Sequence, residues 1–329
     1  MDEKYFEILS NVSAGFQIAS TLAIQMKSLS EIFAELDLHG LAEDPTVYFI
    51  PGFVGLILLE IYLGYREKRN IHKDSKDSFA SVSMGIGSLI IDIGVKTAAF
   101  GVLMFLYQFR IYDLGPNLWY AWVLLFFADD FSFYWHHRLS HQVRVLWAAH
   151  VNHHSSVNYN LAVALRQSWT ELFYKFTFWM WLPIVGFHPI MILTMMSFSL
   201  IYQFWVHTET IGKLGPLEWI LNTPSHHRVH HASNTRYLDR NHAGTLIIWD
   251  RLFGTFEPES EKVKYGLTTN IHTYNLLEIA FHEYRNLFKD MKRAPKLGDK
   301  LRYMIMPPGW SHDGTTMTSD ELRKKEGIV

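Results

Sequence analysis

Long runs of apolar residues divide the chain into helix-sized segments. Val47–Tyr65 holds about 19 residues, which as a helix extend roughly 28 Å, close to the thickness of one bilayer core. Phe79–Phe109 is a longer apolar run, and Leu118–Trp135 is a third. Phe173–Val206 is largely apolar and aromatic, and it is interrupted at Gly186–Pro189, where proline is expected to separate two helices.

This pattern predicts an all-α fold, a polytopic membrane helical bundle of about four to five spans with a helical cap on the cytosolic face. Basic residues concentrate at 66–76, between the first two apolar runs, and the positive-inside rule places this loop in the cytoplasm. Asp92 and Lys96 lie four residues apart inside the second run, where opposite charges are tolerated as a pair. We interpret them as a structural ion pair.

Three regions are predicted along the chain. Residues 1–46 form an N-terminal segment in which Ala14–Met26 is apolar enough for an interfacial helix. Residues 47–256 form the membrane domain, and residues 257–329 form a polar C-terminal tail. The first residues are acidic and lack the basic start of a signal peptide, so an internal helix is expected to direct membrane insertion.

Composition narrows the chemistry that the chain can perform. Hydrophobic residues make up 49% of the sequence, and the formal net charge of −2 provides no electrostatic basis for nucleic-acid binding. The absence of cysteine excludes disulfides, cysteine-ligated iron–sulfur clusters, thiolate zinc sites and a cysteine nucleophile.

Eight of the 18 histidines stand in three groups whose spacing suits one face of a helix. Residues three and four positions apart are neighbours on a helix surface, so each group can direct two or three imidazoles toward one point. Imidazole binds zinc, copper, iron and nickel. Eight imidazoles are too many for one four-coordinate ion. The spacing therefore predicts a dinuclear metal site formed by His137, His141, His150, His153, His154, His227, His230 and His231.

His207 follows the apolar hairpin and is expected at the same depth as these groups, so it is a ninth candidate ligand. The alternatives are isolated histidine pairs without a metal and a pH-sensing patch, and three groups in one chain disfavour both. Histidines without a partner at ligand spacing are expected to lie outside the site, and they are His39, His72, His272, His282 and His312.

Other polar residues near these groups are candidates to support the ligands. Asp129 or Asp130 precedes the first group and could hold a ligand imidazole in one tautomer, although a polar helix end is an equally good interpretation. Arg166, Gln167 and Glu209 also lie close to the histidines along the chain.

The order of the groups is His137–His141, His150–His154, a long apolar insertion and His227–His231. It resembles the membrane fatty acid hydroxylase/sterol desaturase superfamily of non-haem di-iron enzymes, with coverage from about Asp130 to Phe256. Within that superfamily the chain is most similar to the alkylglycerol monooxygenases and their bacterial relatives. The similar segments are WAAHVNHHSS, YNLAVALRQS, QFWVHTE, NTPSHHRVHH and LIIWDRLFGTFE.

The resemblance implies an integral membrane monooxygenase with its active site on the cytoplasmic face, two iron ions and O2 as co-substrate. It also implies a lipid substrate within the bilayer that is hydroxylated next to an ether oxygen and then separates into a fatty aldehyde and a glycerol derivative. Tetrahydrobiopterin is the implied reductant. The electron donor is expected to be external, because no electron-carrier domain is recognised in the sequence.

Other functions stay open at this point. The same ligand set could serve a desaturase or hydroxylase acting on sterols, fatty acids or carotenoids. A zinc-dependent membrane hydrolase would need a glutamate base, and Glu171 and Glu209 flank the histidine groups without lying inside them. A non-catalytic membrane protein is disfavoured because every histidine group is intact. The sequence leaves the oligomeric state undetermined.

Overall fold

The computed structural model describes residues 44–67 and 74–328, and all regular secondary structure within them is helical. Three isolated β-bridges connect loops, and these residues contain no strand. The predicted all-α class is therefore confirmed. Outside the described residues lie the Ala14–Met26 segment, His39, His72 and most of the basic loop.

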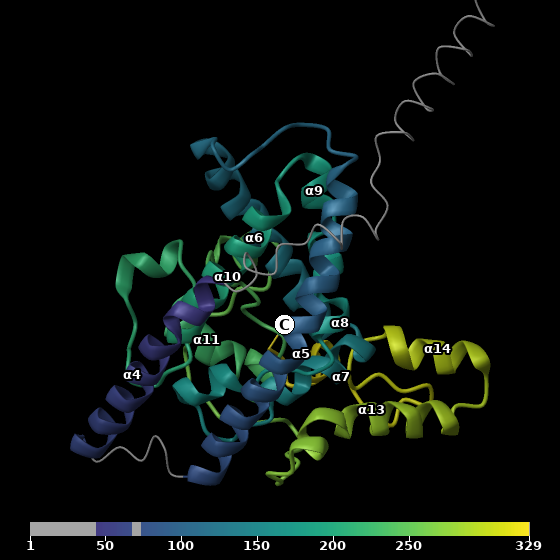
Figure 1. Ribbon diagram of the computed structural model, residues 1–329. Coiled ribbons are helices and arrows are strands. Elements are labelled where there is room, and N and C mark those ends of the chain that lie inside the picture. The colour runs from purple at the N-terminus through teal and green to yellow at the C-terminus, as the bar shows by residue number, and fades with distance from the viewer. Residues whose placement is uncertain (1–43, 68–73, 329) are drawn as a thin grey trace, which may run out of the picture.

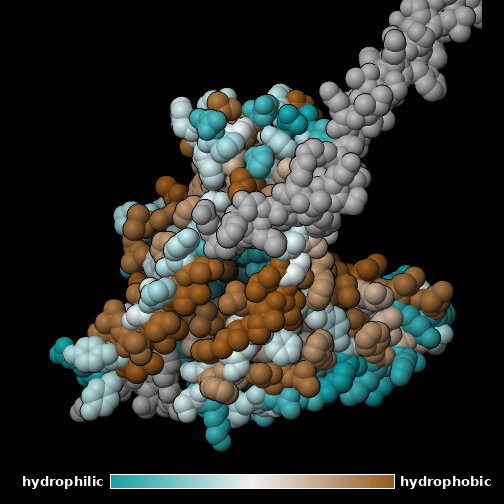
Figure 2. Space-filling model, viewed as in Figure 1, coloured by the Kyte–Doolittle hydropathy of each residue, from teal (hydrophilic) through white to brown (hydrophobic). Residues whose placement is uncertain are grey.

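Among the described residues, two helices are long and apolar enough to cross a membrane, namely α4 (Pro45–Arg66) and α5 (Ser75–Tyr107). They correspond to the first two predicted apolar runs. α4 begins where Asp44 accepts a hydrogen bond from Thr46 N at 2.8 Å. Many large apolar side chains of α4 and α5 are exposed, and Figure 2 shows them as a continuous hydrophobic surface. Such a surface is suited to contact with lipid.

The predicted ion pair inside the second apolar run is present. Lys96 Nζ lies 2.9 Å from Asp92 Oδ2 and 2.6 Å from Asp44 Oδ2. The pair is therefore a triad that joins the middle of α5 to the start of α4, and each charge has a partner of opposite sign.

The largest apolar core is formed by α5, through Ala99 and Leu103, together with inner helices that follow it in the chain. Gly186 ends α9 with φ 133°, and a Cβ there would lie 2.3 Å from Tyr112 O, so only glycine fits. His188 then caps α10 by accepting a hydrogen bond from Ile190 N at 3.3 Å. The predicted break in the hairpin is confirmed. The inner elements are α6 (Trp119–Gln142), η2 (Phe176–Trp179), α9 (Trp181–Val185) and α10 (Pro189–Trp205). The short helix α8 (Leu172–Lys175) directly precedes η2.

Shorter elements carry five of the nine candidate ligands, all on α7 and α11, and these two helices lie below α6 and α10 in the view of Figure 1. A proline at the first or second helical position starts both α11 and η3, where its missing N–H costs no hydrogen bond. These elements are α7 (Arg144–His154), η1 (Leu161–Leu165), η3 (Gly215–Trp219), α11 (Pro224–His230), η4 (Thr235–Tyr237) and α12 (Ile248–Leu252).

The segment predicted as a polar tail contains three helices, α13 (Leu276–Arg293), α14 (Leu297–Ile305) and α15 (Ser319–Lys325). α13 and α14 form the lobe at the lower right of Figure 1. Arg144 at the start of α7 donates hydrogen bonds to Glu283 at 3.0 Å and to Asp290 at 2.6 Å, and both acceptors belong to α13. The lobe is thus bonded to a helix that carries three of the candidate ligands.

A buried ion pair connects α5 to the segment after α7. Arg166 Nη1 lies 3.0 Å from Asp77 Oδ1, and Arg166 Nε donates to Asn152 O at 3.1 Å. Ser156 Oγ donates to the other oxygen of Asp77 at 2.5 Å. Asp77 and Arg166 are 5% and 1% exposed, so neither charge can be solvated by water if its partner is lost.

Replacing Asp77 with alanine should leave the Arg166 guanidinium buried without a counter-charge and destabilise the fold by about 3–5 kcal/mol. Thermal unfolding of the purified protein in detergent measures the effect. Asp113→Ala is the matched control, because that side chain is 76% exposed and 3.8 Å from Arg110. Equal unfolding midpoints for the two variants would contradict the importance of the buried pair.

Candidate metal centre

Nine buried histidines converge from α6, α7, α11 and the end of α10, and they form two groups. Within each group, one ring nitrogen per residue lies within 4.8 Å of the others. The five-histidine group consists of His137, His141, His150, His154 and His230. The four-histidine group consists of His153, His207, His227 and His231.

α7 and α11 each contribute to both groups, and helix geometry explains the division. Successive residues of an α-helix are rotated by about 100°, so residues four apart point only about 40° apart while neighbours diverge strongly. His150 and His154 therefore share the five-histidine group, whereas His153 points to the four-histidine group. α11 repeats the arrangement with the groups exchanged. In each pair of sequence neighbours, His153–His154 and His230–His231, one ring therefore belongs to each group.

The Nε2 atoms of these rings face one another. Five Nε2–Nε2 distances lie between 2.9 and 3.3 Å. The Nε2 atoms of His141 and His230 are buried and have no hydrogen-bond partner in the part of the chain that the structure describes. Buried polar atoms without partners are rare in folded proteins, and they indicate a bound group when they converge.

The contacts of the Nδ1 atoms identify the tautomers of His137 and His150. His137 Nδ1 lies 2.8 Å from His242 O, and His150 Nδ1 lies 3.0 Å from Glu171 Oε2. A carbonyl or carboxylate oxygen only accepts, so each Nδ1 must carry the proton, and Nε2 of the neutral ring then has a free lone pair. The 3.1 Å contact between Nε2 of His137 and Nε2 of His150 therefore joins two acceptors and is not a hydrogen bond.

The protein environment keeps four other rings of the two groups neutral. Burial is the largest of the effects that lower the pKa of His153 and His230 well below the usual 6.5, and neighbouring imidazoles lower it further. The same holds for His154 and His231. Neutral imidazole is the form that binds a metal ion, so the site is in its ligating state at neutral pH.

A turn at residues 239–242 holds three rings of the five-histidine group. Each contact reaches the Nδ1 atom of a ring, so the turn directs the three Nε2 atoms inward. The Asp239 carboxylate lies 3.3 Å from His141 Nδ1, the Arg240 carbonyl 3.0 Å from His230 Nδ1 and the His242 carbonyl 2.8 Å from His137 Nδ1.

The turn is itself held by buried hydrogen bonds. Asp239 and Asn241 have φ values of 54° and 56°, a region that Asp and Asn tolerate better than most residues. Asn241 Nδ2 donates to His226 O at 3.1 Å, and Asp250 accepts from His242 N and Ala243 N at 2.8 Å each. His242 also places its ring 5.1 Å from that of His141, although it belongs to neither group.

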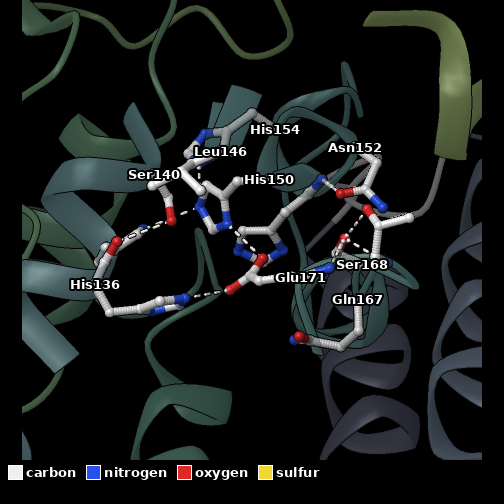
Figure 3. Close-up of polar contacts among 12 residues, drawn as sticks. His136, Ser140, Leu146, His150, Asn152, His154, Gln167, Ser168 and Glu171 are labelled. Atoms are coloured by element: carbon white, nitrogen blue, oxygen red, sulfur yellow. Dashed lines mark hydrogen bonds and ion pairs between the residues drawn. The ribbon is translucent and has the colours of Figure 1, made fainter. Parts of the chain in front are cut away.

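Glu171 supports the five-histidine group from the other side, as Figure 3 shows. One carboxylate oxygen lies 3.0 Å from His150 Nδ1, and the other lies 3.2 Å from Nε2 of His136, a buried histidine outside both groups. Ser168 Oγ accepts a hydrogen bond from Glu171 N at 3.1 Å and fixes the start of α8. A carboxylate behind a ligand imidazole sets its tautomer, orientation and basicity.

The supporting residues proposed from the sequence have other contacts. Asp129 accepts from Trp179 Nε1 at 2.7 Å, and Asp130 accepts from Thr245 N at 2.7 Å and Leu246 N at 2.9 Å. In residues 44–67 and 74–328, no ring nitrogen of the nine histidines is hydrogen-bonded to a side chain of Asp129, Asp130, Arg166, Gln167 or Glu209.

The contacts of Arg166, Gln167 and Glu209 are also away from the rings. Arg166 binds Asp77 and a main-chain carbonyl of α7, so it positions the helix that carries the ligands. Gln167 Nε2 donates to Ala164 O at 2.7 Å, and Glu209 lies beside Tyr265 and Arg228. Sequence reasoning missed the roles of Glu171, His136 and the 239–242 turn. The available sequence signal for the turn was its Asp and Asn residues, since both tolerate positive φ better than most residues.

Comparisons with known proteins place the segment that carries the nine histidines among lipid hydroxylases. The profile of the fatty acid hydroxylase family matches residues 122–255. Alkylglycerol monooxygenase of Danio rerio is 42% identical over 262 residues, which are 79% of this chain and 58% of that protein. The Homo sapiens enzyme of the same name is 39% identical over 262 residues, with the same shares. No solved structure matches the chain.

A bacterial protein is also similar. The ornithine lipid hydroxylase OlsE of Rhizobium tropici is 27% identical over 197 residues, which are 58% of this chain and 58% of that protein.

The chain spans less than two thirds of the length of the alkylglycerol monooxygenases that it matches. The segment matched by the family profile contains all nine histidines, Glu171 and the 239–242 turn, and residues 122–255 of this chain are thus a fatty acid hydroxylase domain.

Proposed function

We propose that this chain is an O2-dependent di-iron membrane oxidoreductase that hydroxylates a lipid C–H bond. The observation that carries the proposal is the 3.1 Å contact between two unprotonated Nε2 atoms, on His137 and His150, within a group of five such rings. Two lone pairs at this distance repel unless a cation lies between them. The four-histidine group adjoins the first through α7 and α11, which supports a second cation.

The donor set fits iron. In this proposal the five-histidine group holds one ion, and the four-histidine group, to which His207 belongs, holds the other. Imidazole nitrogens suit iron, and also zinc and copper, so the choice of iron rests on the fatty acid hydroxylase domain. Two iron ions bound there would activate O2 to remove hydrogen from an unreactive C–H bond.

The chain's own residues prepare the site. Glu171 and the 239–242 turn hold the Nδ1 protons of their imidazoles and keep four Nε2 lone pairs directed inward. All nine ligand candidates are buried, so bulk water is excluded from the space between them. None of these side chains needs to act as a nucleophile, because the reaction requires only ligation, orientation and exclusion of water.

We infer that the substrate is an O-alkylglycerol lipid. Relatives named alkylglycerol monooxygenase, at 39–42% identity, support this choice. One oxygen atom of O2 would enter the C–H bond next to the ether oxygen. The other would leave as water with two electrons and two protons from a reductant, for which we propose tetrahydrobiopterin or another external donor. The hemiacetal product then separates into a fatty aldehyde and a glycerol derivative.

We further propose that α4, α5, α6 and the hairpin that ends with α10 provide four to five membrane crossings, with the metal centre in a helical cap on the cytoplasmic face. The exposed apolar surface of α4 and α5 supports the first two crossings. Arg66 at the end of α4 and Lys76 at the start of α5 support a cytoplasmic connection between them. The lipid would then reach the centre from within the bilayer.

The proposal predicts aldehyde release from an alkylglycerol when the purified protein is supplied with iron, O2 and a reduced pterin. The measurement pairs metal analysis with aldehyde detection on the same preparation. Two irons per chain without aldehyde would redirect the search to sterols, fatty acids, carotenoids and other reductants. Zinc alone, with no O2 uptake after iron reconstitution, would contradict the oxygenase and favour a hydrolase.

Each metal group can be tested separately. His153→Ala removes a ligand from the four-histidine group, and His230→Ala removes one from the five-histidine group. Both variants should lose activity and bind less metal, because a buried ion loses a coordinating nitrogen. His272→Asn is the control, since His272 is exposed and its φ of 45° suits asparagine. Retention of full metal content and activity by either alanine variant would refute the ligand assignment.

Glu171→Ala should lower metal affinity by about 10–100-fold, because His150 loses the carboxylate that sets its tautomer. Competition with a chelator, followed by metal analysis, measures the change. Glu171→Gln keeps one carbonyl acceptor and should have an intermediate affinity. Wild-type affinity in the alanine variant would show that Glu171 has no part in positioning His150.

A further inference from the structure

The α13–α14 lobe exposes two apolar stripes that no element described here covers. Their side chains are between 38% and 73% exposed, although leucine, isoleucine and phenylalanine are normally buried. On α13 the stripe consists of Leu277, Phe281 and Phe288, and on α14 it consists of Leu297, Leu301 and Ile305.

The stripes lie on definite sides of the helices. Residues four apart on a helix differ by about 40° in direction, and residues eleven apart by about 20°, so each set forms one narrow row. The core-facing side of α13 is a different one, because Ile279, Ala280 and Leu287 are buried there. On α14 the buried residue is Tyr303. The exposed rows are therefore additional to the surfaces that hold the lobe in the fold.

Packing against α5 sets the position of the lobe relative to the membrane. Ile279 and Ala280 of α13 form a core cluster with Ala80 and Met84, which lie in the first turns of α5. Trp169 donates from Nε1 to Met84 O at 3.0 Å. α13 thus meets a candidate membrane span near one end of that span, where a bilayer passes from head groups to acyl chains.

The hydrophobic surface seen in Figure 2 supports the same position. It continues from α4 and α5 to the upper side of the α13–α14 lobe, while the lower side of the lobe is hydrophilic. The apolar surface of the lobe therefore lies beside the surface that faces lipid if α4 and α5 cross the membrane.

The charges of the lobe favour an anionic surface. Residues 276–305 contain seven basic and four acidic side chains, in a chain whose formal net charge is −2. Two of the acidic ones, Glu283 and Asp290, are paired with Arg144 of α7. The other two, Glu278 and Asp299, are paired with Arg285 and Arg302 of the lobe, so the excess positive charge is carried by the other five basic side chains. The basic residues are Arg285, Lys289, Lys292, Arg293, Lys296, Lys300 and Arg302.

We propose that α13 and α14 lie in the plane of the membrane surface, with their apolar stripes at the boundary between head groups and acyl chains. Their basic side chains contact the phosphates of anionic lipids. This inference does not depend on the proposed reaction, since it rests on the fold and on α4 and α5 as spans. Because Arg144 joins α13 to α7, a lobe held at the membrane surface also fixes the depth of α7, and so of the metal centre, relative to the bilayer.

The absence of cysteine from the sequence allows single labels at chosen sites. Phe288→Cys and Leu301→Cys place an environment-sensitive fluorophore on the two stripes. Asn286→Cys is the control, because Asn286 is exposed on α13 about 180° from the stripe. The labelled full-length proteins are placed in nanodiscs of phosphatidylcholine, with or without phosphatidylglycerol. Helix content and thermal midpoint confirm that each variant is folded.

Labels at positions 288 and 301 should show blue-shifted emission and quenching by lipids with a nitroxide on the upper acyl chain. The label at position 286 should instead be quenched by aqueous iodide. Phosphatidylglycerol should strengthen the lipid quenching, and added salt should reverse that gain. Equal responses at all three positions would overturn the proposal. Protection from both quenchers, with energy transfer between labelled chains, would also overturn it and assign the stripes to a second copy of the chain.

Discussion

Repulsion between crowded imidazole nitrogens is the constraint on which the rest of this structure depends. Nine buried rings turn their Nε2 atoms toward one another, and where the tautomer can be derived these atoms carry lone pairs. Such an arrangement is unfavourable without cations, so the fold has to hold the rings in place. It does so through acceptors on the outer side of the rings, chiefly Glu171 and the 239–242 turn. These acceptors specify both direction and tautomer.

The position of α7 connects the metal centre to the rest of the molecule. This helix supplies ligands to both histidine groups and is therefore shared by the two proposed ions. Arg166 connects the last turn of α7 to Asp77 of α5, and Arg144, the first residue of α7, is bonded to α13. Because both connections are charged and largely buried, they resist displacement of the helix. The ligand geometry is thus coupled to a candidate membrane span and to the C-terminal lobe.

The placement of the centre is compatible with the lipid substrate that we propose. Apolar side chains cover the outside of α4 and α5, whereas the polar groups near the centre are enclosed. A lipid in the bilayer therefore meets a hydrophobic surface, and the reactive groups stay away from bulk water. The C-terminal lobe, if it lies on the membrane as we propose, would keep the centre at a constant depth beneath the lipid.

The sequence by itself determined the helical class, the first two candidate spans, the break at Gly186–Pro189 and nine candidate ligands. These features depend on local spacing and on residues with strong backbone preferences, which are visible without a partner. Only the tertiary structure decided how the nine histidines divide into two groups and which acceptors orient them. His137 is held by a carbonyl 105 residues away, and the sequence contains no local signal for such a contact. The α13 and α14 stripes show the same limit, because periodicity reveals an apolar row and packing alone decides whether the row is buried or exposed.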